Sequence, residues 1–211
     1  MVKEEKLQDM KDETTKLAEM ASVAIENCMK ALQNRDFELS DFIIRNDKKI
    51  NELYMEIENK CIYLIALEQP VATDLRLISS TMSITNDLER IGDYAVNIAK
   101  INKRIKEKEL VKPLIDLPRM KDIVREEIEI GMDFYKNMTY SEEKLQIDDI
   151  IDDLNKQVFN ELVLIMMGDP KTVDQAGKLM LVGRHLERAG DHAINIANRV
   201  NYIITGDIRY I

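Results

Sequence analysis

One twelve-residue sequence occurs twice in this chain, as LERIGDYAVNIA at 88–99 and as LERAGDHAINIA at 186–197. Nine of the twelve positions are identical, and the copies lie 98 residues apart in a chain of 211. In both copies the apolar residues recur at spacings of three and four, the period of an amphipathic helix. A repeat that returns after almost half the chain predicts two structurally equivalent halves.

Apolar residues keep this helical spacing along almost the whole chain, and only 7 Gly and 4 Pro interrupt it. We therefore expect long helices and no sheet. The spacing and the breaks predict six of them, at 5–34, 37–67, 73–107, 118–138, 141–167 and 172–205. Thr172 and Gln175 are spaced as a capping box for the last helix.

The stretch KEKELVKPLIDLP carries two of the prolines and divides the chain near its middle. We predict a first bundle at 1–110 and a second at 111–211. Each half is three helices, too small alone for more than a modest core. The predicted fold class is all-α, a tandem repeat of two antiparallel three-helix bundles.

Charge and cysteine content narrow the possible functions. The formal net charge of -9 and the lack of a basic patch disfavour nucleic-acid binding. No apolar run reaches the roughly 18 residues that a membrane span requires, and the charged start MVKEEKLQDMKDE is unlike a secretory signal. Cys28 and Cys61 each lie among apolar neighbours, as reduced core residues of a cytoplasmic protein do.

Packing explains the apolar positions of the repeat but not its acids. With Leu88 at the centre of the apolar stripe, Glu89 lies at roughly +100° and Asp93 at roughly +140° on a helical wheel. On the preceding helix, with Ile50 at the centre, Asn51 also lies at roughly +100°. Like flanks meet across an antiparallel helix pair, so these polar side chains are expected to face one another.

The height of these residues along the hairpin follows from their numbers. If the chain folds back at Pro70, residues at one height have numbers that sum to about 140, which pairs Glu89 with Asn51 and Asp93 with Asp47. In the second half the corresponding sum of 339 makes two equivalent pairs, Glu187 with Asp152 and Asp191 with Asp148. The same cluster of four side chains is thus predicted twice.

Carboxylates at one height repel one another, and a bound cation relieves that repulsion. Oxygen ligands favour hard metals such as Mg, Mn, Ca or iron. The predicted ligands are Asp47, Asn51, Glu89, Asp93, Asp148, Asp152, Glu187 and Asp191. The alternative is a pair of solvated flanks neutralised by Arg90 and Arg188.

The remaining residues of interest have structural interpretations. Gly92 and Gly190 lie beside the core, where a helical glycine costs about 1 kcal/mol relative to alanine, so we expect a close approach there. His185 and His192 lie on the flank opposite the acids and are expected on the surface. Their spacing excludes the Glu-x-x-His pattern of di-iron bundles. We find no phosphate-binding glycine loop, dinucleotide turn, nucleophile elbow or CxxC zinc pattern.

The doubled LER(I/A)GD, each preceded by a helix with D-x-x-I-(N/D), resembles the PhoU family of phosphate-uptake regulators, as does QPVATDLR at 69–76. The resemblance spans essentially the whole chain. It implies a cytoplasmic, homodimeric, non-enzymatic negative regulator of phosphate uptake and phosphate-starvation signalling. The implied partners are the ATPase subunit of the phosphate ABC transporter and a sensor histidine kinase, so that the protein meets the membrane only through its partners.

The resemblance also implies multinuclear iron or zinc clusters, with manganese or magnesium as alternatives, at the E(D)-x-x-x-D motifs Glu89 with Asp93 and Glu187 with Asp191. Asn51 departs from this pattern, since Asp152 supplies an acid at the matching position, and we expect the first site to bind metal more weakly. The alternative function is a metal-dependent phosphohydrolase that uses the carboxylate clusters. A purely structural scaffold leaves the doubled acids unexplained.

Overall fold

The computed structural model describes residues 2–107, 109–145 and 148–207. Within these ranges the chain is all-α, with six α-helices, two short 3-10 helices and no strand, as the sequence predicts. The helices are α1 (Glu4–Asn34), α2 (Phe37–Glu68), α3 (Ala72–Arg104), α4 (Asp116–Asn137), α5 (Asp148–Gly168) and α6 (Val173–Thr205), with η1 at Glu142–Leu145 and η2 at Pro170–Thr172.

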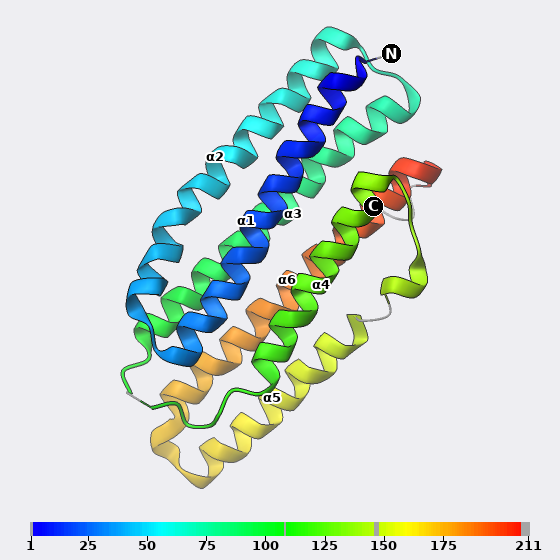
Figure 1. Cartoon of the computed structure of the whole chain (residues 1–211). Helices are drawn as coiled ribbons and strands as arrows, with labels where there is room; N and C mark the ends of the chain where they lie inside the picture. Colours follow the sequence, from blue (N-terminus) through cyan, green and yellow to red (C-terminus); the bar gives the residue numbers. More distant parts are fainter. Residues whose placement is uncertain (1, 108, 146–147, 208–211) are drawn as a thin grey trace.

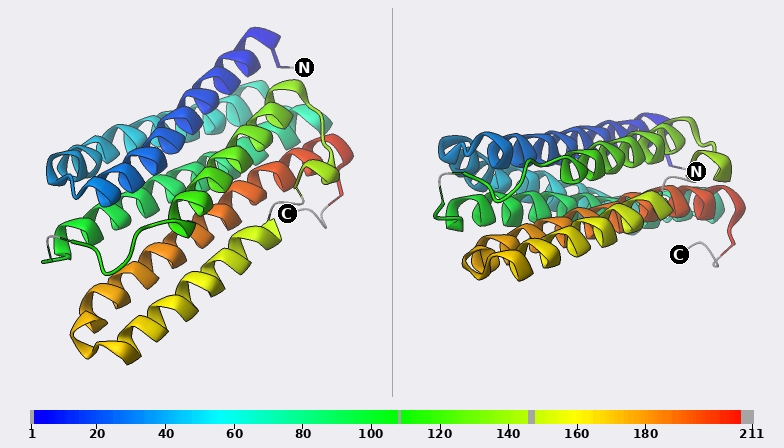
Figure 2. Two further views of the ribbon diagram at one scale, coloured as in Figure 1. Left: turned by 60° about the horizontal axis from the view of Figure 1, so that its bottom comes forward. Right: turned by 90° about the horizontal axis from the view of Figure 1, so that it is seen from below.

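The helices form two antiparallel three-helix bundles, α1–α3 and α4–α6 (Figure 1). The bundles lie against each other in opposite directions, so that the α2–α3 turn and the α5–α6 turn stand at opposite ends of the molecule (Figures 1 and 2). Contacts of α3 with α6 and of α1 with α4 join the bundles, and one cluster of buried apolar side chains extends through both. The bundle division at residues 110 and 111 stays a prediction.

The sequence NRD at 34–36 becomes a tight turn between α1 and α2. Arg35 ends α1 in the left-handed conformation, with a φ of 54°, and the Asp36 carboxylate accepts a hydrogen bond from Leu39 N at 2.8 Å to cap α2. The Arg35 guanidinium also donates to the carbonyls of Asn102 at 2.9 Å and Ile105 at 2.8 Å. This one arginine therefore fixes the end of α3 to the α1–α2 turn.

Two local predictions are wrong. The fifth helix begins at Asp148 rather than 141, because 142–145 form a 3-10 turn. The capping box does not form either: Thr172 makes no side-chain cap to α6. Gln175 is 1% exposed and instead donates to Glu109 O at 3.0 Å and accepts from Val111 N, because a buried amide must satisfy its hydrogen bonds. Gln175 thereby holds the linker between the halves.

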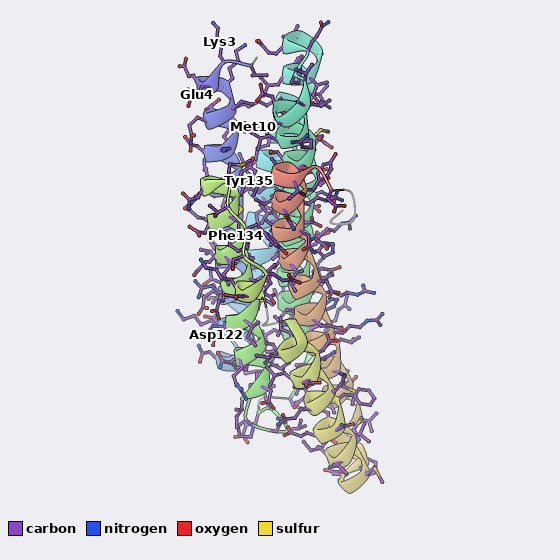
Figure 3. The ribbon with its side chains drawn as sticks, turned by 90° about the vertical axis from the view of Figure 1, so that its right-hand side faces the viewer. Lys3, Glu4, Met10, Asp122, Phe134 and Tyr135 are labelled. Atoms are coloured by element: carbon purple, nitrogen blue, oxygen red, sulfur yellow. The ribbon has the colours of Figure 1, made fainter. Side chains whose placement is uncertain are left out.

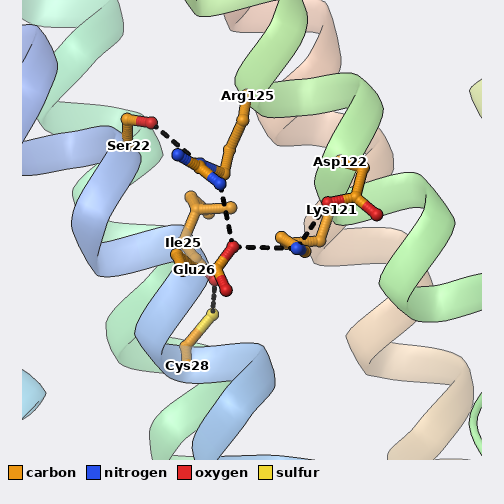
Figure 4. Close-up of polar contacts among 7 residues, drawn as sticks. All are labelled: Ser22, Ile25, Glu26, Cys28, Lys121, Asp122 and Arg125. Carbon is orange, nitrogen blue, oxygen red and sulfur yellow. Dashed lines mark hydrogen bonds and ion pairs between the residues drawn. The ribbon is translucent and has the colours of Figure 1, made fainter.

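Polar contacts also join the halves. Phe134 and Tyr135 of α4, labelled in Figure 3, are fully buried. The Tyr135 hydroxyl lies 2.6 Å from Thr81 Oγ1 of α3, which satisfies both groups inside the core. Near the surface, Glu26 of α1 accepts hydrogen bonds from Lys121 and Arg125 of α4 (Figure 4).

Both cysteines are buried and carry free thiols, as predicted. Across the described ranges, each helix is either too short or too polar to cross a membrane.

Candidate metal centres

The first acidic cluster, here named the first seam, consists of Asp47 and Asn51 on α2 with Glu89 and Asp93 on α3. The two helices approach closely at Gly92. A Cβ atom there would lie 3.2 Å from Ile50 Cδ1 and 3.8 Å from Asp47 Oδ1. The glycine therefore allows the Asp47 carboxylate to lie directly against α3, as the wheel and the height argument predict.

The carboxylates of the first seam interact electrostatically. Burial raises the pKa of Asp47, and the neighbouring Asp93 carboxylate raises it further, while a hydrogen bond from Asn51 Nδ2 at 3.2 Å opposes this. Burial also raises the pKa of Glu89, again with Asp93 as the next cause. Like charges from two helices are thus held together at the edge of the core.

Two oxygens of this seam are candidates for metal ligation. Asp47 Oδ1 and Asn51 Oδ1 are buried and accept no hydrogen bond from any described residue. A buried acceptor without a partner costs free energy that a cation would recover. These oxygens fit the ligand set that hard metals prefer.

Arg90 approaches the seam from its exposed side. Its guanidinium lies 3.9 Å from Glu89 Oε2 and 3.8 Å from Asp93 Oδ2. The arginine side chain is 56% exposed, and exposed pairs at such distances stabilise a fold only weakly. Arg90 therefore screens Glu89 and Asp93 only in part.

The second seam contains Asp152 on α5 with Glu187 and Asp191 on α6. Burial raises the pKa of Glu187, and the carboxylates of Asp191 and Asp152 raise it further. Burial and Asp152 likewise raise the pKa of Asp191. The structure thus brings these three predicted residues together, whereas the side chain of Asp148, the first residue of α5, lies outside the described part.

A further carboxylate, on α4, lies beside the glycine of the second repeat copy. A Cβ atom at Gly190 would lie 2.7 Å from Ile151 Cδ1 and 3.3 Å from Glu127 Oε2. Glu127 belongs to α4 and is 1% exposed. The sequence does not indicate Glu127, because α4 contains several acidic residues. Only the packing of α4 on α6 distinguishes Glu127 from the others.

The donors of both seams are oxygens, which suits a hard cation. Among the side chains that the structure describes, however, no three of His, Cys, Asp or Glu are grouped closely enough to hold one ion. Ion binding by these described side chains alone would therefore require the carboxylates to change rotamer.

The histidines are half-buried between the bundles, whereas the sequence predicts them on the surface. His192 Nδ1 lies 2.8 Å from Asp87 Oδ1 of α3. The Tyr94 ring centroid lies 5.7 Å from that of His185 and 5.8 Å from that of His192. The flank opposite the acids is covered by the other bundle, so these side chains join α3 to α6.

A cavity of about 200 Å³ opens beside the first seam. Its wall includes Asp47, Ile50 and Gly92, together with Ala24 of α1 and Phe42 of α2. The first seam therefore has free space on the side that faces α1.

Comparison with known proteins supports the internal duplication. The sequence matches the PhoU domain twice, at residues 14–101 and 117–200. It is 38% identical to a Phosphate-specific transport system accessory protein PhoU homolog of Clostridium acetobutylicum, over 96% of this chain and 94% of that protein. An Aquifex aeolicus protein described in the same words is 35% identical over 96% and 92% of the two chains.

Two crystal structures share the fold over nearly the full length. The phosphate transport system regulatory protein PhoU from Streptococcus pneumoniae superposes with a TM-score of 0.88, at 28% identity and 96% coverage of both chains. PhoU from Pseudomonas aeruginosa gives a TM-score of 0.89 at 28% identity, over 96% of this chain and 98% of that one. Each half of this chain, seam included, therefore corresponds to one domain of a known kind.

Proposed function

The chain belongs to the PhoU family, and from this premise we propose that it is a non-enzymatic accessory protein that regulates phosphate uptake and binds metal ions in its two acidic seams. Relatives that cover nearly the whole chain are described as accessory proteins of the phosphate-specific transport system. The full-length match supports the same regulatory role here.

The observation that carries the metal part of the proposal is the recurrence of one acidic seam in each PhoU domain. Both seams lie where a glycine of the twelve-residue repeat, Gly92 on α3 or Gly190 on α6, allows two helices to approach closely. Packing alone does not require acids there, since their pKa values are raised by burial and by one another. A function common to both seams explains why the acids occur twice.

A bound cation would supply positive charge to each seam. Asp47, Asn51, Glu89 and Asp93 would hold it in the first, and Asp148, Asp152, Glu187 and Asp191 in the second. The carboxylates of each seam come from two helices, so ligation would tie α2 to α3 and α5 to α6. It would also remove negative charge from the surface that a partner meets.

We propose that the partner is the ATPase subunit of the phosphate ABC transporter, with a sensor histidine kinase as a second partner. The protein would act on them in the cytoplasm as a homodimer and restrain phosphate import when phosphate is sufficient. It would meet the membrane only through the transporter or the kinase.

The experiment compares a second-seam variant, Glu187→Gln with Asp191→Asn, with a control in which Glu142→Gln and Glu143→Gln remove the same two charges from the exposed η1 turn. Phosphate uptake by cells and co-purification of the transporter ATPase subunit are measured for both. We expect the seam variant alone to lose the ATPase subunit and to raise uptake in phosphate-rich medium. Unchanged uptake and co-purification in the seam variant would refute the proposal.

A further inference from the structure

The turn between α2 and α3 carries strained backbone. Gln69 and Ala72 both adopt the left-handed conformation, with φ of 46° and 49°, which glycine normally supplies at helix ends and tight turns. Strain of this kind persists only where the surrounding structure fixes it, and it is concentrated at functional surfaces. Pro70 is buried and anchors the turn to the bundle, whereas Val71 beside it is 70% exposed.

Contacts from the start of α1 hold both sides of this turn. Lys6 Nζ lies 2.6 Å from Glu68 Oε1 at the end of α2, and Val2 N donates to Asp74 Oδ2 at 3.2 Å in the first turn of α3. The start of α1 and the α2–α3 turn thus stand together at one end of the molecule (Figure 1). An apolar side chain displayed on a fixed turn loses little conformational freedom when a partner binds it.

Val71 belongs to a row of exposed apolar side chains, here named the tip patch. Its members recur every four residues from the end of α2 to the start of α3, and each is between 40% and 76% exposed: Tyr63, Leu67, Val71 and Leu75. Exposed apolar side chains grouped in this way, with polar residues around them, mark interaction sites. An exposed tyrosine among them suits the role of a binding anchor.

A groove of about 480 Å³ adjoins the tip patch between α1 and α2. Tyr63, Leu64 and Leu67 form its apolar part. Its charged walls come from both helices, and they consist of two lysines and three acids: Lys6, Lys60, Asp9, Glu56 and Glu68. The groove therefore combines an apolar floor with ionic walls.

The walls of the groove carry an excess of negative charge. Lys60 Nζ lies 2.7 Å from Asp9 Oδ2 and 2.6 Å from Glu13 Oε1, and Lys6 is held by the ion pair described above. Four carboxylates, the three of the walls and Glu13, thus face two lysines, which leaves a net charge of -2. Complementary charge on a partner favours its encounter with such a surface.

We propose that the tip patch and the groove form a docking site for a basic amphipathic helix of a partner protein. The apolar face of that helix packs on Tyr63 and Leu67, and its lysine or arginine side chains meet the acids of the walls. A second copy of this chain fits less well, because a net charge of -9 brings acids against acids. The docking site shares no residue with either seam, so it does not depend on bound metal.

The probe is a fluorescein-labelled synthetic helix of leucine and lysine, about 18 residues long so that it can form a helix. Its binding to the full chain is followed by fluorescence anisotropy, beside a peptide with glutamate in place of each lysine. We expect the lysine peptide alone to bind, and its affinity to fall as salt rises. Equal binding of the two peptides, or no binding of the lysine peptide, would overturn the proposal.

Paired variants locate the docking site. Tyr63→Ser with Leu67→Ser should weaken binding at least about tenfold, as loss of central anchors does. Leu164→Ser with Met167→Ser is the matched control, because these side chains near the end of α5 are 69% and 76% exposed, and it should leave the affinity unchanged. Circular dichroism checks that both variants stay helical. Equal weakening by the two pairs would mean that the peptide binds any exposed apolar surface, contrary to the proposal.

The charge of the walls is tested in the same way. Glu56→Gln with Glu68→Gln should weaken binding of the lysine peptide and reduce its salt dependence. Glu142→Gln with Glu143→Gln, which removes the same two charges from η1, should do neither. An unchanged salt dependence in the groove variant would contradict the role of the acids.

Sedimentation velocity then distinguishes the occupants of the tip patch. The same mass for the unaltered chain and the Tyr63→Ser, Leu67→Ser variant supports a separate partner protein. A dimer of the unaltered chain that dissociates in this variant would show that a second copy covers the patch, and the proposal would fail.

Discussion

Replacement of Gly131 by alanine should destabilise the protein, because α4 and α6 meet there without room for a side chain. A Cβ atom at Gly131 would lie 3.1 Å from Ile196 Cγ2, 3.3 Å from Ile196 Cβ and 3.5 Å from the backbone nitrogen of Ala197. The Cβ of isoleucine and its branches are stiff in a helix, and the backbone of α6 moves only if the helix moves. The new methyl group can therefore be accommodated only by separating α4 from α6, the contact that also places Glu127 against Gly190.

The magnitude follows from two opposing effects. Overpacking of a tight contact costs about 1–3 kcal/mol. Alanine in place of glycine gains about 1 kcal/mol of helix propensity. The net loss in the free energy of unfolding should be about 1 kcal/mol.

Gly177 of α6 provides the matched control, because a Cβ atom there would meet nothing within 4 Å. Gly177→Ala has only the propensity effect and should stabilise the protein by up to about 1 kcal/mol. Urea unfolding followed by circular dichroism measures both variants, and the midpoints can be compared where the m-value is unchanged. A Gly131→Ala protein as stable as the Gly177→Ala protein would refute the close-packing argument.

Two further predictions concern charge. Glu26→Gln should cost about 1 kcal/mol near neutral pH, the upper end for partly exposed pairs, because Glu26 Oε2 accepts hydrogen bonds from Lys121 Nζ at 2.8 Å and Arg125 at 3.0 Å. These contacts lower the pKa of Glu26, with Lys121 the main cause. The stabilisation is therefore present above the ordinary pKa of 4.5 and disappears as pH falls through the pKa of the folded state. Urea unfolding checks this, and an equal loss of unfolding free energy in acid and at neutral pH would contradict it. The pKa values of Glu89 and Glu187 are raised instead. Just above pH 4.5 the metal-free folded chain therefore binds more protons than the unfolded chain. Its stability should fall as pH rises from 4.5 through the pKa values of the folded state. Thermal unfolding across this range should show a smaller fall in the Glu89→Gln, Glu187→Gln variant, and an unchanged slope would show that burial and the neighbouring carboxylates do not raise these two pKa values.

Much of the fold follows from local sequence signals. The six helices were predictable because the apolar period is continuous and each helix end carries a distinct break, such as Asp36 or Pro170. Consecutive helices joined by a short turn must be antiparallel neighbours, so the pairing of Asp47 with Asp93 followed from residue numbers alone. The start of α5 could not be predicted, because the sequence EEKL at 142–145 suits a 3-10 turn as well as an α-helix.

What escaped prediction depends on helices that are distant in sequence. A helical wheel places His192 and Glu127 relative to the core of their own bundle, but it does not show which helix packs on the other side. His192 lies on Asp87 of the first bundle, and Glu127 lies on Gly190 across α4 and α6. Gln175 likewise bonds to the linker at Glu109 and not to its own helix end.

The most direct test of the account is the metal content of the purified, untagged protein beside that of a variant in which Glu89, Asp93, Glu187 and Asp191 are all replaced by alanine. If the acidic seams bind metal, the unaltered protein should hold iron, zinc or manganese at about one ion per chain or more, and the variant should lose the metal while it is still helical by circular dichroism. No metal in the unaltered protein, even after reconstitution with each ion, would contradict the account, and the doubled acids would then serve a protein contact.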